Sequence, residues 1–279
     1  LNGLQNATVY YVRPYAINSR GLSYGKVTSF RTTYAGEANN LSAYGTSNCY
    51  IVEPAYSKHY INGSVKGHTY ESIGSVASVE VLWETNGYGM KTEPGTVIFD
   101  VTLKDGNIYF CTNGVEGNAL VASKDAMGTI LWSWHIWVVD FDPVETQQTY
   151  ISGAVMMDRN LGALKVKGDV TANGLIYYWG RKDPFPSPVS HSEFAATAPA
   201  NVVEHIENYN TYEYSIQNPT TVIISGAWND SYTNWDASKT MYDPCPPGWK
   251  VPSLNVWDKI VHSGSPILEP YSTPEAYYP

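Results

Sequence analysis

The first 33 residues alternate between two sets of side chains with the two-residue period of a β-strand. In residues 8–16, Tyr10 and Val12 fall on one face and the residues between them on the other. The polar residues 18–21 predict a turn, and residues 23–32 predict a second strand. We therefore expect a hairpin, which cannot bury its apolar face alone. Upstream strands of the same domain, the next domain or another chain would have to cover that face.

Residues 34–48 are rich in Ala, Gly, Asn, Ser and Thr and predict a linker. Residues 49–144 then carry short apolar runs separated by turn-forming residues such as Asp105-Gly106, a signal for a tight hairpin. Short strands at this spacing predict an immunoglobulin-like β-sandwich. The predicted strands are residues 49–52, 76–83, 96–103, 107–112, 119–124 and 130–139.

The last of these predicted strands has large side chains on both faces. One face carries Trp132, Trp134 and Ile136, and the other carries Leu131, Ser133, His135 and Trp137. This pattern predicts a strand that is buried in the sandwich on one side and contacts a neighbouring domain on the other. We expect His135 to be a packed side chain and not a metal ligand.

Residues 149–279 lose the regular alternation and predict a mixed α+β module. Ser253 is a suitable N-cap for a short helix that would carry Leu254, Trp257, Ile260 and Val261 on one face. We also consider a second short helix at residues 177–179.

Composition narrows the class of protein without naming its function. The chain has 279 residues, 43% of them hydrophobic and 15% charged, which argues against disorder. A net charge of −9 with no basic stripe argues against a nucleic-acid partner. No apolar run approaches the roughly 20 residues that span a bilayer. The 23 Tyr and 9 Trp suit half-buried strand faces and binding surfaces.

Three cysteines, Cys49, Cys111 and Cys245, are too few for a disulfide scaffold. They form no Cys-x-x-Cys motif and no cluster with His, so we do not expect a structural zinc site. A Cys49–Cys111 disulfide remains open at this point. Because Leu1 stands where a Met would start a chain and no leader follows, we expect a piece of a longer polypeptide.

Two stretches of the chain resemble known families. Residues 1–33 resemble the last two strands of a fibronectin type III domain, with Tyr10 at that family's tyrosine-corner position. Further on, the motifs at residues 157–162, 174–184 and 243–253 resemble those of the Fibrobacter succinogenes major paralogous domain. That domain is found in exported, cell-surface and fimbria-associated proteins of Bacteroidetes.

The second resemblance implies a C-type-lectin-like, formylglycine-generating-enzyme-like α+β fold for residues 149–279. The family's domains continue beyond the helix that Trp257 marks, so we expect this module to be incomplete. The predicted fold class is therefore mainly β, with immunoglobulin- and fibronectin-like sandwich modules followed by the α+β module. The resemblance to the major paralogous domain also implies an extracellular, cell-surface protein whose anchor lies outside this chain.

Catalytic motifs are not found in the sequence, and we expect no enzyme. Cys245 lies between two prolines with no second Cys nearby, whereas a formylglycine-generating enzyme needs reactive thiols. Hydrolase, metalloprotease and phosphate-loop motifs are missing as well. The carboxylates considered for glycoside hydrolysis, which we expect to be solvated, are Glu53, Glu71, Glu80 and Glu84.

Ligand-binding candidates are found near residue 230. Trp228-Asn229-Asp230 matches the tripeptide of the calcium-dependent sugar site in C-type lectins, and Asn and Asp oxygens suit Ca²⁺. The accompanying Glu-Pro-Asn or Gln-Pro-Asp element is missing, so we expect no cofactor and keep Ca²⁺ as an alternative. Trp228, Tyr232 and Trp235 would also stack on sugar rings without a metal. Packing in the domain core is the competing interpretation.

The sequence therefore favours a non-catalytic module for adhesion or recognition at the cell surface, with a glycan or a host or bacterial surface protein as its partner. The alternative is a stalk, fimbrial or pilus subunit that acts as a spacer or by strand complementation. We expect upstream and downstream domains of the same chain to accompany it. The ligand and the oligomeric state stay open.

Overall fold

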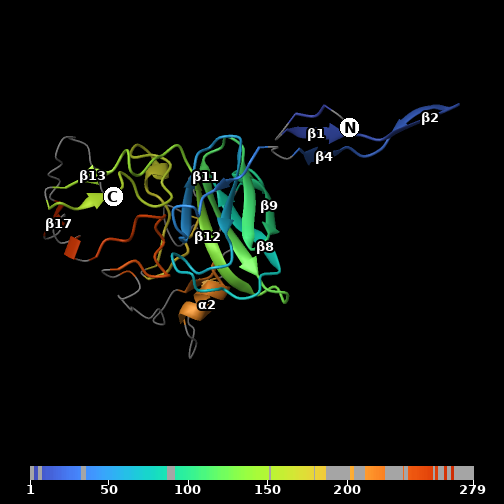
Figure 1. Ribbon diagram of the computed structural model, residues 1–279. Helices are drawn as coiled ribbons and strands as arrows, with labels where there is room; N and C mark the ends of the chain where they lie inside the picture. The colour runs from blue at the N-terminus through green and yellow to red at the C-terminus, as the bar shows by residue number, and fades with distance from the viewer. Residues whose placement is uncertain are drawn as a thin grey trace.

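The computed structural model describes most of the first 186 residues and shorter segments after them, and it is mainly β (Figure 1). The described residues are 3–5, 8–32, 36–86, 92–150, 152–178, 180–186, 202–203, 211–223, 235, 238–253, 255–256, 261–262 and 265–266.

The N-terminal hairpin is present but is interrupted in the middle. β1 (Val9–Val12) pairs with β4 (Thr28–Arg31), and β2 (Tyr15–Asn18) pairs with β3 (Gly21–Tyr24), both antiparallel. The continuous strands that we predicted are wrong at Pro14, because proline has no N–H to donate to the ladder. Figure 1 shows the hairpin extending away from the larger β-structure.

Apolar side chains of the hairpin stay open to solvent, as expected for two strand pairs without a covering layer. Tyr15 and Ile17 are 66% and 71% exposed, and Leu22 and Tyr24 opposite them are 51% and 53% exposed.

Tyr10 makes the hydrogen bond that defines a tyrosine corner. Its hydroxyl accepts from the backbone N–H of Gln5 at 2.8 Å, and its ring stacks on Phe30 with centroids 5.9 Å apart. In a tyrosine corner the hydroxyl bonds the backbone a few residues upstream. The geometry agrees with the resemblance to the fibronectin family, and membership of that family stays a prediction.

Two four-stranded sheets form the central sandwich. One sheet has the order β5-β7-β10-β9 and the other β6-β12-β11-β8. Their bounds are β5 (Asn39–Asn40), β6 (Cys49–Val52), β7 (Ser57–Asn62), β8 (Ser78–Thr85), β9 (Ile98–Lys104), β10 (Asn107–Thr112), β11 (Gly117–Lys124) and β12 (Ile130–Val138). All six predicted strands are present, and β5 and β7 are additional. β7 was missed because a polar residue, His59, takes one of its buried positions.

The core lies between the sheets and confirms the prediction for the tryptophan-rich strand. Trp132, Trp134 and Ile136 of β12 are at most 1% exposed and pack in the main apolar cluster. The opposite face of β12 is also buried, since Ser133 and Trp137 are fully covered. β12 is therefore buried on both sides.

The predicted linker, residues 34–48, is described from residue 36 onward, and its end is packed. Asn40 ends β5, and Ser47 and Asn48 are 0% and 2% exposed. The side-chain amide of Asn48 donates to the carbonyls of Met241 at 2.7 Å and Asp243 at 2.8 Å. Its oxygen accepts from the indole N–H of Trp132 at 2.9 Å. Ser47 and Asn48 are therefore part of the packed structure, while the linker and the division into domains stay predictions.

The C-terminal region has little regular structure. Its elements are β13 (Gln148–Thr149), β14 (Val155–Met156), η1 (Val170–Ala172), β15 (Val202–Val203), α2 (Thr211–Gln217), β16 (Val222–Ile223), β17 (Val261–His262) and β18 (Ser265–Pro266). Helix α2, which we did not predict, packs against β12. In the described part of the chain, no helix has the length and apolarity needed to cross a membrane.

The two short helices that we predicted fare differently. Tyr177 and Tyr178 are not helical, because they lie inside a loop that the bridge between Ile176 and Phe185 closes. At the second position, the N–H of Val256 donates to the carbonyl of Ser253 at 2.9 Å in a short helical turn. Leu254 and residues 257–260 lie outside the described residues.

We predict that Asn48→Ala lowers the free energy of unfolding by about 3 kcal/mol, because three buried hydrogen bonds are lost at about 1 kcal/mol each. Urea denaturation measures this change. The exposed Asn39→Ala is the matched control and should stay within about 0.5 kcal/mol of the wild type. Equal stability of the two variants would show that Asn48 does not hold residues 241–243 to β12.

Candidate functional site

A cavity of about 1120 Å³ lies in the C-terminal region. Residues 148–177 form one part of its wall, and Trp235 with residues 244–256 forms the other. This volume is slightly above the range that is typical of small-ligand sites, roughly 300–1000 Å³. The aromatic side chains that line it are Tyr150, Tyr177, Trp235 and Trp249.

Trp235 is the one predicted ligand-binding residue that the structure describes. Its side chain lines the cavity and is 8% exposed, and its indole N–H donates to the carbonyl of Tyr242 at 3.0 Å. Its ring meets Tyr177 edge to face, with centroids 6.5 Å apart. Trp235 is thus both packed and part of the wall. The other predicted residues, Trp228, Asn229, Asp230 and Tyr232, lie outside the described residues.

A glycine of the motif at residues 157–162 brings the cavity wall against the sandwich. Gly162 has φ of +81°, and a Cβ on it would lie 2.5 Å from Cγ of Leu175. Its carbonyl accepts from the side-chain amide of Asn118 on β11 at 2.9 Å. The N–H of Leu175 donates to the carbonyl of Leu161 at 2.8 Å. Only glycine fits this close approach and backbone conformation.

Each of the two carboxylates described on the wall is paired with a cation. Arg159 donates through Nε and Nη2 to the carboxylate of Asp158 at 2.8 and 3.2 Å, and its guanidinium lies 4.0 Å from the ring centre of Phe141. Asp169 caps η1 and pairs with Lys165 at 2.9 Å. Hydrogen bonds from Thr171 and then Lys165 lower the pKa of Asp169 to about 2. Both carboxylates therefore already have a cation as partner.

A Cys–His–Asn cluster lies in the interior, and Tyr177 connects it to the cavity wall. Sγ of Cys49 is 3.3 Å from Nδ1 of His135, and Nε2 of His135 is 2.8 Å from the side-chain oxygen of Asn118. The Tyr177 hydroxyl is 3.4 Å from the same Nδ1. Because the amide nitrogen of Asn118 already donates to Gly162, its oxygen accepts from His135, which assigns the ring proton to Nε2.

The sequence search missed this cluster because its members are far apart along the chain. Parallel pairing of β6 with β12 places Cys49 directly beside His135. Papain-like proteases arrange the same three residue types for nucleophilic catalysis. There the thiolate is the nucleophile, so the chemistry depends on the pKa of the thiol.

Burial favours a neutral Cys49 thiol here, whereas the nucleophile of a papain-like protease is a thiolate. Cys49 and His135 are 0% and 1% exposed. Desolvation raises the pKa of the Cys49 thiol and lowers the pKa of His135 to about 3. Burial also raises the pKa of Cys245 well above its ordinary value. A neutral thiol beside a neutral imidazole is a packing contact and not an activated nucleophile.

The disulfide that the sequence left open is not formed. Cys49, Cys111 and Cys245 are all buried and none of them forms a disulfide. Cys49 belongs to the sheet of β6 and Cys111 to the sheet of β10, so the two lie in different layers.

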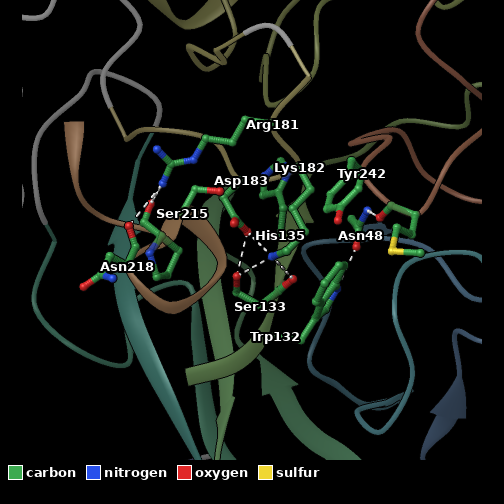
Figure 2. Close-up of polar contacts among 12 residues, drawn as sticks. Asn48, Trp132, Ser133, His135, Arg181, Lys182, Asp183, Ser215, Asn218 and Tyr242 are labelled. Carbon is green, nitrogen blue, oxygen red and sulfur yellow. Dashed lines mark hydrogen bonds and ion pairs between the residues drawn. The ribbon is translucent and has the colours of Figure 1, made fainter. Parts of the chain in front are cut away.

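A second buried polar cluster joins the C-terminal region to β12 (Figure 2). Nζ of Lys182 is 2.6 Å from both the Asp183 carboxylate and the Ser133 hydroxyl, and the ammonium lies 4.5 Å from the ring centre of Trp132. The Ser133 hydroxyl also donates to Asp183 at 2.6 Å. Desolvation lowers the pKa of Lys182 to about 8. None of these residues lines the cavity, so we assign the cluster a role in packing.

One carboxylate contradicts the expectation that all four candidates are solvated. Glu84 is 4% exposed and accepts from the backbone N–H groups of Gly95, Val97 and Ile98 at 2.6, 3.1 and 2.7 Å. Desolvation raises its pKa. The other three, Glu53, Glu71 and Glu80, are exposed as predicted.

Metal-binding groups do not converge in the part of the chain that the structure describes, where no three His, Cys, Asp or Glu side chains come together. The calcium alternative rested on Asn229 and Asp230, which lie outside that part, so it remains a prediction.

Comparisons with known proteins give no family. No protein-family model and no curated protein matches the chain. A cadmium-bound structure of SporoSAG is similar at 10% sequence identity with a TM-score of 0.21. The match spans 47% of this chain and 59% of that chain, less than two thirds of its length. A likeness this weak carries no argument, so the function has to be argued from the residues of this chain.

We predict acid destabilisation from two buried histidines. Desolvation lowers the pKa of His135 to about 3 and that of His59 to about 4, both below the ordinary 6.5. Between pH 6.5 and those values the unfolded chain binds protons that the native state does not. The free energy of unfolding should therefore decrease as the pH is lowered through that window, by about 1.4 kcal/mol per pH unit for each histidine. Urea unfolding at pH 7, 6 and 5 measures how the free energy of unfolding depends on pH. His59→Gln should remove the contribution of His59 to this dependence. The same slope in both proteins would show that burial does not suppress protonation of His59.

We also predict that iodoacetamide leaves the three thiols of the native protein unmodified at pH 8. All three thiols are covered, and burial raises the pKa values of Cys49 and Cys245, so little thiolate is offered to the reagent. Intact-mass analysis should show no adduct on the native chain and three adducts after unfolding in guanidinium. Rapid labelling of Cys49 in the native state would instead support an active thiol.

Proposed function

We propose that this chain is a non-catalytic recognition module that binds a saccharide in the aromatic cavity. The single observation that carries the proposal is the size and lining of that cavity, which four aromatic side chains share. Ligand sites are concave and mostly apolar, with a few polar groups that orient the ligand.

The lining suits a sugar ring in particular. The C–H face of a pyranose is apolar and packs on Trp and Tyr rings, while its hydroxyl groups need donors and acceptors at the edge of the contact. Trp249 is half-buried, so part of its ring is open to such a contact. Trp235 is held by Tyr242 and Tyr177, so little side-chain entropy is lost when a ligand binds against it.

The buried clusters support a role without bond-making. The Cys49 thiol, the His135 imidazole and the Lys182 amine all lie in the interior, whereas a nucleophile and its base must reach the substrate. Among the cluster residues, Tyr177 lines the cavity, and burial raises the pKa of its hydroxyl well above the ordinary value. A phenol in that state serves packing and hydrogen bonding.

We place this module in an exported, cell-surface protein of the Bacteroidetes type. The three motifs that resemble the major paralogous domain support that proposal, and so does the tyrosine-corner geometry of Tyr10.

A spacer role is the second candidate, and the buried contacts between β12 and the C-terminal region favour it. Lys182, Asp183 and Asn48 tie the C-terminal region to β12 through groups that are at most 3% exposed. Such buried polar contacts hold one relative arrangement, which suits a rigid stalk module.

Binding to a glycan array with Trp249→Ala tests the proposal. The wild type should bind at least one saccharide, and the variant should bind it about tenfold more weakly or worse, a loss of roughly 1.4 kcal/mol or more. Tyr70→Ala removes an aromatic ring that is 91% exposed and does not line the cavity, so it should bind like the wild type. An EDTA arm separates the calcium alternative. No binding to any saccharide would favour the spacer.

A further inference from the structure

We infer that the ligand of this cavity is an acidic saccharide, and that Arg159 and Lys250 are the wall cations that bind its carboxylate groups. The inference rests on the proposed saccharide function and goes one step further, to the chemical class of the ligand. Its evidence is the balance of charge on the cavity wall, the state of the Arg159 guanidinium and the position of Lys250 beside Trp249.

Among the described residues that line the cavity, cations outnumber carboxylates. The cations are Arg159, Lys167 and Lys250, and the carboxylates are Asp158 and Asp169. Each carboxylate already has a cation in contact, because Asp158 is paired with Arg159 and Asp169 with Lys165, which stands outside the wall. The whole chain has a net charge of −9, so this local surplus of positive charge is not a property of the surface in general. A surplus of this sign attracts an anionic ligand.

Arg159 has a donor left for that ligand. Its side chain is only 9% exposed, and Asp158 occupies Nε and Nη2. Among the described residues, none accepts a hydrogen bond from Nη1. Contact with the Phe141 ring fixes the plane of the guanidinium. An oxygen that enters the cavity therefore meets a positioned donor in a partly dry environment, where a charge-assisted hydrogen bond is strong.

Lys250 adds a second positive group next to an aromatic surface. It is exposed on the cavity wall and directly follows Trp249 in the chain. The next residue, Val251, donates its backbone N–H to the buried carboxylate of Asp243 at 2.9 Å, which anchors this part of the loop. A sugar ring that packs on Trp249 would hold a ring carboxylate within reach of the Lys250 ammonium.

The same charge balance works against a calcium-bridged complex at this wall. Both of its carboxylates are engaged by cations, so neither offers a free oxygen ligand to Ca²⁺. Binding of the acidic saccharide should therefore survive EDTA and should weaken as salt screens the lysine.

Isothermal titration of matched saccharides tests the inference. The probes are a galacturonate trimer, a hyaluronan tetramer and 3′-sialyllactose, with a galactose trimer, a chitin tetramer and lactose as their neutral counterparts. Each is titrated at 20 and 300 mM NaCl, with and without EDTA. We expect one acidic probe to bind more tightly than its neutral counterpart, by roughly tenfold at low salt, and to lose most of that advantage at high salt.

Two variants locate the carboxylate contact. Lys250→Gln changes an exposed residue and should weaken the acidic probe by about threefold to tenfold while leaving the neutral one unchanged. Arg159→Lys keeps the charge next to Asp158 but loses the planar fork, and it should cost a similar factor. Lys104→Gln, an exposed charge on β9 that does not line the cavity, is the control and should change neither.

The possible outcomes distinguish failure of this inference from failure of the proposed saccharide binding on which it rests. If neutral probes bind as tightly as acidic ones, and neither salt nor Lys250→Gln matters, the acidic class is wrong while saccharide binding stands. If no probe binds at either salt concentration, and the glycan array is also blank, the proposed function fails and this inference fails with it. Binding that EDTA abolishes would overturn the metal-independent carboxylate contact.

Discussion

Strand β12 carries polar side chains on a face that is closed to water, and β11 and the C-terminal region supply their partners. Ser133 and His135 are 0% and 1% exposed, and an unpaired buried polar group costs on the order of 1–3 kcal/mol. Lys182 and Asp183 satisfy Ser133, and Asn118 satisfies His135. These contacts dictate where residues 181–183 lie on the sandwich. They explain why a region with little regular structure packs in one arrangement against the sheet.

The cavity wall inherits its position from that packing. Asn118 serves both sides, because its oxygen accepts from His135 while its amide donates to the carbonyl of Gly162 in the wall. Tyr177 likewise touches His135 and lines the cavity. Aromatic groups held in this way need little reorganisation when a ligand arrives, which is how a preformed site gains affinity. The recognition that we propose for this site would therefore depend on the polar contacts beneath β12 as much as on the rings themselves.

Most of the reactive side chains described above lie away from the cavity, and the Cys245 thiol, which does line it, is 6% exposed with a pKa that burial raises. Cys49, His135 and Lys182 lie in the interior, where desolvation favours their neutral forms. Arg159 and Lys250 line the cavity together with the aromatic rings. In the Cys–His–Asn arrangement, three residue types suited to catalysis lie at hydrogen-bonding distance in the interior, where the thiol and the imidazole are covered. Access and dielectric decide what such a cluster does.

Local patterns in the sequence determined the strands, because alternation of side chains is a property of a strand by itself. The bounds of β6 and β10 follow from it to the residue, and the tryptophans of β12 indicated burial on both faces. Tertiary structure decided what depends on distant partners. Asn48 looked like part of a linker, because its partners Met241 and Asp243 are 193 and 195 residues away. The contact of Cys49 with His135 depends on the parallel register of β6 and β12, and the cavity on loops closed by glycines. A polar or reactive side chain takes its role from the groups that surround it, and those are set only when the chain is folded.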